Sequence, residues 1–414
     1  MSTKERHIKQ PLDLALRQFR VVAVGGARQV GKSTLVETLP GRHFVTLDDL
    51  SVLAAARSDP QGFIDALPTP ATIDEIQRVP ELLLAIKARV DRSREPGAFL
   101  ITGSSRLDTI QGIRESLAGR IALLELRPMT LFEGRGNASP VILEELDDAR
   151  DATAAAALFA RVRRPERVGG EQVLTGGFPE PCLHLKASER EAWLREYRRS
   201  YVERDAPAVV RVEDVPQLAR FFLGATATTA QLLNLTNLAR DTGVSPDTAR
   251  RWIGLLEATF VAERRLPLWR NLRTRLVRSP KLYLCDSGLA ASTLGLHDWN
   301  PAEHNPLRGH LLETWVHQQL AALAEVADPP FELSFFRTHG QEEVDFVLTR
   351  GRRAIAIEVK LGATVRPEDA RPLERFAERL GKECRYGLVL YSGHTVIPLA
   401  PRTVAVPLSA FFAM

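Results

Sequence analysis

The chain has 414 residues, which is enough for two to four domains that each bury a core. Its 44% apolar and 26% charged residues are typical of a soluble globular protein. The net charge of +4 is modest, so composition alone does not indicate a nucleic-acid partner.

The cysteine pattern and the apolar runs exclude several further classes. Cys182, Cys285 and Cys384 are far apart and lack C-x-x-C spacing, which argues against a disulfide framework or a thiolate zinc site. Charges or prolines interrupt every long apolar run, so we expect no transmembrane helix. The first 18 residues are too charged for a signal peptide and resemble a first helix. We therefore expect a cytoplasmic protein.

A phosphate-binding loop lies near the N-terminus. Residues 19–24 form a short apolar strand, residues 26–33 read GARQVGKS, and residues 34–39 continue as a helix. This matches G-x-x-x-x-G-K-S/T in the strand–loop–helix context that the motif requires. The glycines let backbone N–H groups close around a polyphosphate, and the helix N-terminus adds its positive end. We expect ATP to be bound by Gly26, Ala27, Arg28, Gln29, Val30, Gly31, Lys32, Ser33 and Thr34. Lys32 should reach the β- and γ-phosphates, and the Ser33 hydroxyl should ligate Mg²⁺.

An acidic pair follows a later strand, in the segment PATIDEIQRVP at residues 70–80. Asp74 would hold the magnesium shell, and Glu75 would polarise the attacking water. The alternative is a solvated helix N-terminus, and the strand is less apolar than a buried central strand usually is. Another strand at residues 44–47 lies between the loop and this pair. That order favours a hydrolase-type P-loop ATPase with a parallel α/β sheet over a small kinase.

Two further segments supply polar side chains to this half of the chain. Residues 99–105, FLITGSS, read as the next strand, and Thr102 or Ser104 at its end could sense the γ-phosphate, unless this is an ordinary strand-end turn. Residues 115–128 give a helix end, then Gly119 and Arg120, then another strand. Arg120 is a catalytic candidate that would act in cis or across a subunit contact. An ordinary surface arginine is the alternative.

The middle of the chain is predicted to be helical. Residues 138–167 contain two helical pieces, residues 176–181 a loop, and residues 189–211 an amphipathic helix whose aromatic residues form a packed face. A helix-turn-helix follows, with helices at residues 232–240 and 247–258 and with Ser245 as the N-cap. Thr248, Arg250 and Arg251 would face a DNA groove.

Residues 264–281 then hold seven basic residues and no acid, and Trp269 lies among them. The seven are Arg264, Arg265, Arg270, Arg273, Arg275, Arg278 and Lys281. Such a stretch would suit a wing that lies against a phosphate backbone. The alternative is a helix-turn-helix that packs against the protein itself.

A second set of charged residues lies near the C-terminus. Glu313 is on a predicted amphipathic helix at 309–323, Asp345 is on a strand at 342–348, and Glu358 and Lys360 share one face of a strand at 354–361. The three carboxylates could gather Mg²⁺ or Mn²⁺. Lys360 and Glu358 are then catalytic candidates, with Lys360 stabilising developing phosphate charge. The alternatives are a buried Glu–Lys pair on an edge strand, or a nuclease fold that has lost activity. Another strand at 333–337, a helix at 367–380 and strands at 385–391 and 403–407 would complete a nuclease-like module.

With these motifs in order, the chain resembles a prokaryotic family of AAA-type ATPases. Its members carry a C-terminal domain of unknown function with a restriction-endonuclease-like core of the PD-(D/E)xK type. The resemblance spans almost the whole chain, through GARQVGKS, LDD, IDEIQRVPELL, TGSS, SLAGR, GGFPEP, YVERD, SPKLYLCDSGL, GHLLETWV, EEVDFVL and AIEVKL. It implies nucleotide and magnesium roles for Lys32, Ser33, Asp74 and Glu75. It also assigns Glu313, Asp345, Glu358 and Lys360 to a nuclease-type motif.

The expected division is an AAA-type ATPase domain at 1–135, a helical linker at 136–215, a winged-helix-like region at 216–285 and an endonuclease-like domain at 286–414. We expect an ATP-binding and ATP-hydrolysing protein that acts on DNA, with a Mg²⁺-dependent nuclease-like site. The alternative is an ATP-switched DNA-binding or regulatory protein whose nuclease-like domain is an inactive interaction module. A P-loop kinase is disfavoured by the acidic pair and the extra domains. The expected partners are ATP and DNA, no membrane is expected, and a homo-oligomer stays open.

Overall fold

The structure is a computed structural model, and it describes residues 4–106, 119–137, 140–162, 165–209, 212, 214–268, 279–299, 305–338 and 342–413. The chain divides into two compact units. The N-terminal unit is Met1–Met129 with Gly254–Val261, and the C-terminal unit is Thr130–Ile253 with Ala262–Met414. Within the described ranges, no helix combines the length and apolar character needed to cross a membrane. The finer division into four domains stays a prediction.

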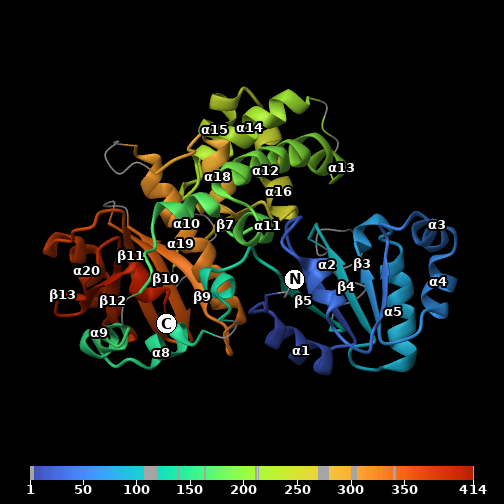
Figure 1. Ribbon diagram of the computed structural model, residues 1–414, viewed down its shortest axis with the longest axis horizontal. Helices are drawn as coiled ribbons and strands as arrows, with labels where there is room; N and C mark the ends of the chain where they lie inside the picture. Colours follow the sequence, from blue (N-terminus) through green and yellow to red (C-terminus); the bar gives the residue numbers. More distant parts are fainter. Residues whose placement is uncertain are drawn as a thin grey trace. The chain divides into compact units, whose positions relative to one another are not determined.

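The N-terminal unit contains the predicted parallel sheet (Figure 1). Its strands are β1 (Val21–Gly25), β2 (His43–Thr46), β3 (Ala71–Asp74), β4 (Phe99–Gly103) and β5 (Ile121–Glu125). Among the described residues they form one sheet in the order β2-β3-β4-β1-β5, and every neighbouring pair is parallel. All five strands therefore end at the same edge, and β4 lies between the strand of the phosphate-binding loop and the strand of the acidic pair.

Helices cover this sheet. They are α1 (Lys9–Gln18), α2 (Lys32–Glu37), α3 (Leu50–Ser58), α4 (Pro60–Ala66), α5 (Leu82–Ser93) and the 3₁₀ turn η1 (Ile76–Arg78). Apolar side chains of α3, α4 and α5 share one core with β1, β3 and β4. Strand β3 is fully buried although it contains Thr72, whose hydroxyl accepts a hydrogen bond from Arg42 Nε at 3.0 Å. A satisfied hydroxyl is tolerated in a core, which explains why this polar strand can be central.

The first part of the C-terminal unit is helical, as expected. Its helices are α7 (Leu131–Arg135), α8 (Ile142–Asp148), α9 (Ala152–Ala160), α10 (Gly170–Thr175), α11 (Pro179–Leu183), α12 (Ala187–Ser200), the π-helical turn η3 (Tyr201–Asp205), α13 (Ala206–Val209) and α14 (Val215–Ala227). The predicted aromatic face packs internally, because the Tyr197 ring lies 4.6 Å from Phe178 and 5.4 Å from Trp193 between centroids.

A winged-helix-like arrangement follows α14. It consists of β6 (Gln231–Leu232), α15 (Leu235–Thr242), α16 (Pro246–Ala258), β7 (Ala262–Arg265) and β8 (Lys281–Leu284). In the described chain β8 lies between β6 and β7 and is antiparallel to both. The predicted cap is present, since Ser245 Oγ accepts from the Thr248 N–H at 3.1 Å. The first helix begins three residues later than predicted, because Gln231 and Leu232 pair with β8.

The unit ends in a mixed sheet and its helices (Figure 1). The elements are α18 (Ser287–Thr293), α19 (Leu307–Val326), β9 (Glu332–Arg337), β10 (Glu343–Arg350), β11 (Arg353–Lys360), η4 (Pro367–Ala370), α20 (Arg371–Leu380), η5 (Gly381–Glu383), β12 (Cys384–Tyr391), β13 (Ile397–Ala400), β14 (Thr403–Pro407) and α21 (Leu408–Phe411). The described strands are ordered β13-β14-β12-β11-β10-β9. Helix α20 packs against β10, β11 and β12. The predicted amphipathic helix α19 is instead buried on all sides from Leu311 to Ala324.

Candidate functional site

The phosphate-binding loop adopts a backbone that only particular residues can follow. Gly26 and Gly31 have φ values of 157° and 94°, and Gln29 has a φ of 64°. A Cβ added at Gly26 would lie 2.4 Å from the Leu126 carbonyl oxygen, so no side chain fits there. Positive-φ residues within such a loop turn N–H groups toward a common centre, which is how backbone loops bind anions.

Lys32 lies at the start of α2 and is buried, with 4% of its surface exposed. Its Nζ donates hydrogen bonds to the carbonyl oxygens of Gly26 and Ala27, both at 3.0 Å. Burial lowers the pKa of Lys32 to about 8, although the carboxylates of Glu75 and Asp74 oppose the shift. The ammonium is thus held beneath the loop in a place where an anion would stabilise its charge.

Ser33 and Asp74 meet at the edge where the strands end. Ser33 Oγ donates to Asp74 Oδ2 at 2.9 Å and lies 3.1 Å from Oδ1. Thr46 Oγ1 donates to the same carboxylate at 3.3 Å, and Thr102 Oγ1 donates to it from the end of β4. The predicted magnesium ligands therefore lie together, and a hydroxyl beside a fixed carboxylate is a donor set suited to Mg²⁺.

Glu75 is positioned by an unusual backbone and two polar neighbours. Its φ of 58° is left-handed, which costs a non-glycine residue on the order of 1 kcal/mol and is found preferentially at functional sites. Gln77 Nε2 donates to Glu75 Oε2, and Ser104 Oγ donates to the same oxygen at 3.2 Å. The Glu75 N–H donates to Thr102 Oγ1 at 3.1 Å. Thr102, near the end of β4, and Ser104, just beyond it, thus hold the acidic pair in place. Sensing of the γ-phosphate by either residue stays a prediction.

Gln77 was not identified from the sequence, although it lies two residues beyond Glu75 in IDEIQR. A pocket of about 330 Å³ opens over these groups and is lined by Lys32, Ser33 and Glu75, among others. Asp48 and Arg78 also line it and form an ion pair at 2.5 Å, which sequence reasoning likewise missed. The buried ammonium, the hydroxyl–carboxylate pair and the loop that excludes side chains together fit a magnesium-bound polyphosphate.

Arg120 does not join this site in its own chain. It precedes β5, and Val21 and Gly25 of β1 pair with Ile121 and Glu125. Arg120 therefore lies at the opposite edge of the sheet from the loop, roughly 16 Å away for five strand residues. Its guanidinium binds Asp91, with Nη2–Oδ2 at 3.2 Å. This corrects the expectation of a role in cis, whereas a role across a subunit contact stays a prediction.

The second set of predicted residues surrounds a lysine. Lys281 Nζ lies 2.7 Å from Glu313 Oε1, 2.5 Å from Glu343 Oε1 and 3.7 Å from Asp345 Oδ1, and its side chain is 2% exposed. Tyr283 donates its hydroxyl to the same Glu313 oxygen at 2.7 Å. We call these five residues, together with Glu358 and Lys360, the acidic cluster. Lys281 was predicted to be part of an exposed basic wing, and its burial corrects that expectation.

The outer part of the acidic cluster is held by local bonds. The Val359 N–H donates to Asp345 Oδ2 at 2.9 Å, and Lys360 Nζ donates to Glu358 Oε1 at 3.0 Å. Glu358 Oε2 is buried and has no hydrogen-bond partner within the described chain. Among the described residues, no group of three or more His, Cys, Asp or Glu side chains is arranged to hold a metal ion.

Burial and mutual repulsion shift the protonation of the acidic cluster. Desolvation and then the neighbouring Asp345 raise the pKa of Glu313 to about 8, and the same two causes raise the pKa of Glu358 to about 8. Burial alone would lower the pKa of Lys281, but the surrounding carboxylates raise it well above its usual value. Near neutral pH the two lysines therefore stay charged, and protons on two of the carboxyls reduce the excess of negative charge.

Arg265, another basic residue of the predicted wing, also has an internal role. Arg265 Nε donates to His317 Nε2 at 2.9 Å, and its Nη2 lies 2.7 Å from Glu263. On α16, Arg250 and Arg251 are exposed, and Arg250 forms an exposed ion pair with Asp247 at 2.8 Å. Trp269, Arg270, Arg273, Arg275 and Arg278 lie outside the described residues.

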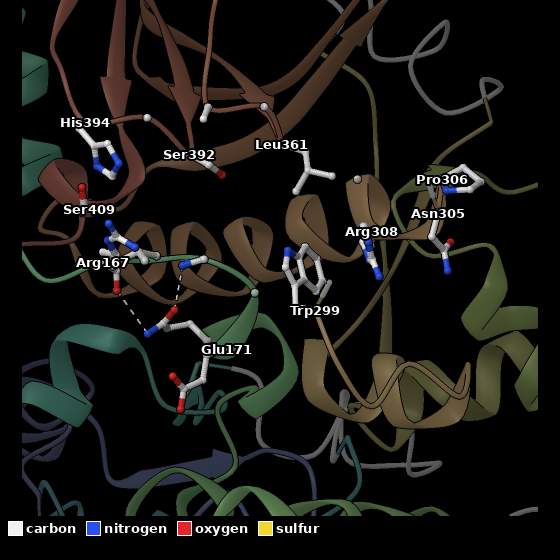
Figure 2. Close-up of a pocket in the computed structure, with 18 residues that line it drawn as sticks. Arg167, Glu171, Trp299, Asn305, Pro306, Arg308, Leu361, Ser392, His394 and Ser409 are labelled. Atoms are coloured by element: carbon white, nitrogen blue, oxygen red, sulfur yellow. Dashed lines mark hydrogen bonds between the residues drawn. The ribbon is translucent and has the colours of Figure 1, made fainter. Parts of the chain in front are cut away.

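A larger pocket of about 970 Å³ lies in the C-terminal unit, beside the ends of β11 and β12. Figure 2 shows Leu361, Ser392 and His394 along one side of it and Arg167, Trp299 and Arg308 along the other. The Arg308 guanidinium lies 5.8 Å from the centre of the Trp299 ring, in the range of a cation–π contact. The pocket thus combines two arginines with an aromatic ring.

The loop, the parallel sheet and the acidic residues at the strand ends define a P-loop nucleotide-binding protein. Residues 18–134 match the AAA domain family, which makes this chain an AAA-family ATP-binding protein. Residues 170–300 match a domain of unknown function (DUF8612), and residues 308–411 match another (DUF4143).

Two curated mycobacterial proteins resemble nearly the whole chain. They are described as Uncharacterized protein Rv2008c of Mycobacterium tuberculosis and Uncharacterized protein Mb2031c of Mycobacterium bovis. Each is 32% identical over 98% of this chain and 84% of its own length. The chain belongs to the same family as these two proteins.

Solved structures show weaker likenesses. A STAND ATPase with a tetratricopeptide repeat sensor, from Pyrococcus horikoshii, is 10% identical with a TM-score of 0.24, over 78% of this chain and 49% of its own. This chain thus spans about half the length of that protein. Protein VC1899 from Vibrio cholerae is 13% identical with a TM-score of 0.20, over 95% of this chain and 96% of its own. At these scores neither likeness carries an argument about function.

Proposed function

We propose that the protein is a Mg²⁺-dependent ATPase whose nucleotide state controls contact with DNA. The observation that carries the ATPase part is a pocket lined by Lys32, Ser33 and Glu75, in which the Ser33 hydroxyl is bonded to the carboxylate of Asp74. Lys32 would bind the β- and γ-phosphates, and Ser33 and Asp74 would hold the magnesium ion. The magnesium ion would neutralise negative charge on the phosphates.

Glu75 is the residue that we assign to activating water. It directly follows the magnesium ligand Asp74, its carboxylate lines the pocket, and Gln77 and Ser104 both donate to Oε2. Those two bonds leave Oε1 to accept a proton from a water molecule. Hydrolysis should therefore depend on the Glu75 carboxylate, while nucleotide binding should depend on Lys32.

The proposed DNA contact involves the winged-helix-like region. It is supported by the order of α14, β6, α15, α16, β7 and β8, which is that of a winged helix, and by the exposed Arg250 and Arg251 on α16. The pocket with Arg167, Trp299 and Arg308 offers a second surface that suits a phosphate backbone and a stacked base. Metal-dependent cleavage is not expected of this protein, because Lys281 lies among the carboxylates.

The test is steady-state ATP hydrolysis by the full chain, with and without duplex DNA, on wild type and three variants. We expect Glu75→Gln to bind ATP but to lose turnover, and Lys32→Ala to lose both. Glu81→Gln, which changes an exposed glutamate of the same unit, is the matched control and should behave as wild type. Full turnover by Glu75→Gln would remove the assigned role of that residue.

DNA contact is measured in parallel by fluorescence anisotropy at several salt concentrations. Replacing both Arg250 and Arg251 with Ala should weaken binding at least tenfold and flatten its salt dependence, since each arginine that contacts phosphate releases counterions. Arg371→Ala, an exposed arginine on α20, is the control. Unchanged affinity of the double variant would exclude α16 as the contact, and no binding in any nucleotide state would exclude DNA as the partner.

A further inference from the structure

Lys281 is the first residue of β8, yet its side chain serves the C-terminal sheet. Its ammonium lies between Glu313 of α19 and Glu343 of β10, at 2.7 and 2.5 Å, and Asp345 is 3.7 Å away. The lysine is 2% exposed, so solvent does not share this charge. The centre of the acidic cluster is therefore already occupied by a cation that belongs to the protein.

The oxygens around Lys281 are arranged for an ammonium. Charge-assisted N–H···O bonds are about 2.7–2.9 Å long, and the Glu313 contact falls within this range. Magnesium requires about six oxygens at roughly 2.0–2.1 Å in octahedral geometry. With the nitrogen between them, the Glu313 and Glu343 oxygens leave no room for such a shell. A divalent cation placed beside Lys281 would also meet its positive charge across a dry interior.

Other bonds hold the cluster in this form. Tyr283 shares the Glu313 oxygen with Lys281, and Asp345 accepts the Val359 N–H at 2.9 Å. Lys281 and Tyr283 both come from β8, whereas the carboxylates come from α19 and β10. The acidic cluster thus connects the sheet that contains β8 to the sheet that contains β10 through charged side chains. This connection needs no metal.

We propose that the Lys281 ammonium takes the place of the divalent cation that an active nuclease of the PD-(D/E)xK type would bind between these carboxylates. Three carboxylates of the acidic cluster, Glu313, Asp345 and Glu358, then bind neither Mg²⁺ nor Mn²⁺. The C-terminal domain contacts its partners without metal-dependent cleavage. This inference is independent of the proposed ATPase, since it concerns other residues and is tested without nucleotide.

The experiment measures Mn²⁺ binding to the full chain without nucleotide, by electron paramagnetic resonance of the free ion. Asp74→Asn is introduced into every protein to remove the metal ligand of the nucleotide site. In protein that retains Lys281, we expect the same amount of bound Mn²⁺ with and without Asp345→Asn. Lys281→Met should gain one Mn²⁺ per chain, and adding Asp345→Asn should abolish that gain. Lys382→Met, at an exposed lysine of the same unit, is the matched control and should gain none.

Two results would overturn the proposal. One is Mn²⁺ bound at about one per chain by protein that retains Lys281, and lost on Asp345→Asn. The other is a folded Lys281→Met variant that binds no Mn²⁺, because the carboxylates would then not form a latent cation site. If Lys281→Met does not fold, the proposal is tested by protein that retains Lys281, measured with and without Asp345→Asn. One Mn²⁺ per chain that is bound with Asp345 and lost with Asp345→Asn would refute the proposal.

Discussion

Raising the pH should weaken nucleotide binding through a single residue, Lys32. Its side chain is 4% exposed, and burial lowers its pKa from 10.5 to about 8. A polyphosphate beside Nζ stabilises the ammonium and restores a high pKa in the complex. Above pH 8 the free protein has lost this proton and the complex retains it. Binding therefore takes up a proton there, and affinity falls as the pH rises.

The expected size follows from the shift. With a pKa of about 8, about one chain in eleven keeps the charged Lys32 at pH 9, compared with about nine in ten at pH 7. The Kd for Mg²⁺-nucleotide should then be about tenfold weaker at pH 9 than at pH 7, or about 1.4 kcal/mol. The free protein should change in the opposite direction. Keeping a buried ammonium costs about 3 kcal/mol below pH 8, and this cost disappears as the pH rises from 8 to 10.5.

The assay is calorimetric titration with Mg²⁺-ADP from pH 7 to pH 9.5, in pairs of buffers that differ in ionisation enthalpy. The buffer dependence gives the number of protons taken up, which should approach one per nucleotide at pH 9. Lys32→Arg is the control, because a guanidinium keeps its proton throughout this range. The reasoning fails if the wild-type Kd is the same at pH 7 and pH 9, or if the arginine variant shows the same slope.

Three other changes have defined outcomes. Gly26→Ala places a Cβ 2.4 Å from the Leu126 carbonyl oxygen, so nucleotide affinity measured by calorimetry should fall at least a hundredfold. Gln77→Ala removes a donor to Glu75, and steady-state kinetics should show kcat reduced about tenfold with unchanged KM. Asp286→Ala removes the acceptor of the Leu289 N–H that caps α18 and of the buried Gly177 N–H. Its free energy of unfolding in urea should fall by about 2–4 kcal/mol, and an unchanged value would show that water replaces the carboxylate.

The nucleotide site could be predicted from the sequence because its residues are set by local backbone. The loop follows β1 and the acidic pair follows β3, and parallel strands end at one edge, so Ser33 and Asp74 had to meet. Thr102 was recognised for the same reason, as the end of the strand between them. Gln77 was missed since its role depends on the 3₁₀ turn η1 and on the left-handed Glu75, neither of which has a sequence signature.

Arg120 lies on the wrong side of its strand for the role predicted in its own chain. The sequence already placed it before a strand, whereas the loop follows one. In a parallel sheet, residues before a strand and residues after a strand lie at opposite edges, so a role in cis was excluded by topology alone. A Gly–Arg pair suggests a catalytic arginine only where the direction of the adjacent strand also brings the arginine side chain to the phosphate-binding loop.

Lys281 illustrates a different limit. It was counted in a basic stretch because seven cations without an acid look like one surface, but Lys281 begins β8 and its side chain is buried. Lys281 and Tyr283 are two apart in KLYL and so lie on one face of β8, the same alternation that was applied to Glu358 and Lys360. A cation in an otherwise apolar, fully buried strand needs an acidic partner, and three carboxylates in buried segments need a cation. The cost of burying unpaired charge therefore applies to the basic stretch and to the C-terminal carboxylates alike. Considering the two together pairs Lys281 with Glu313, 32 residues away, without any metal.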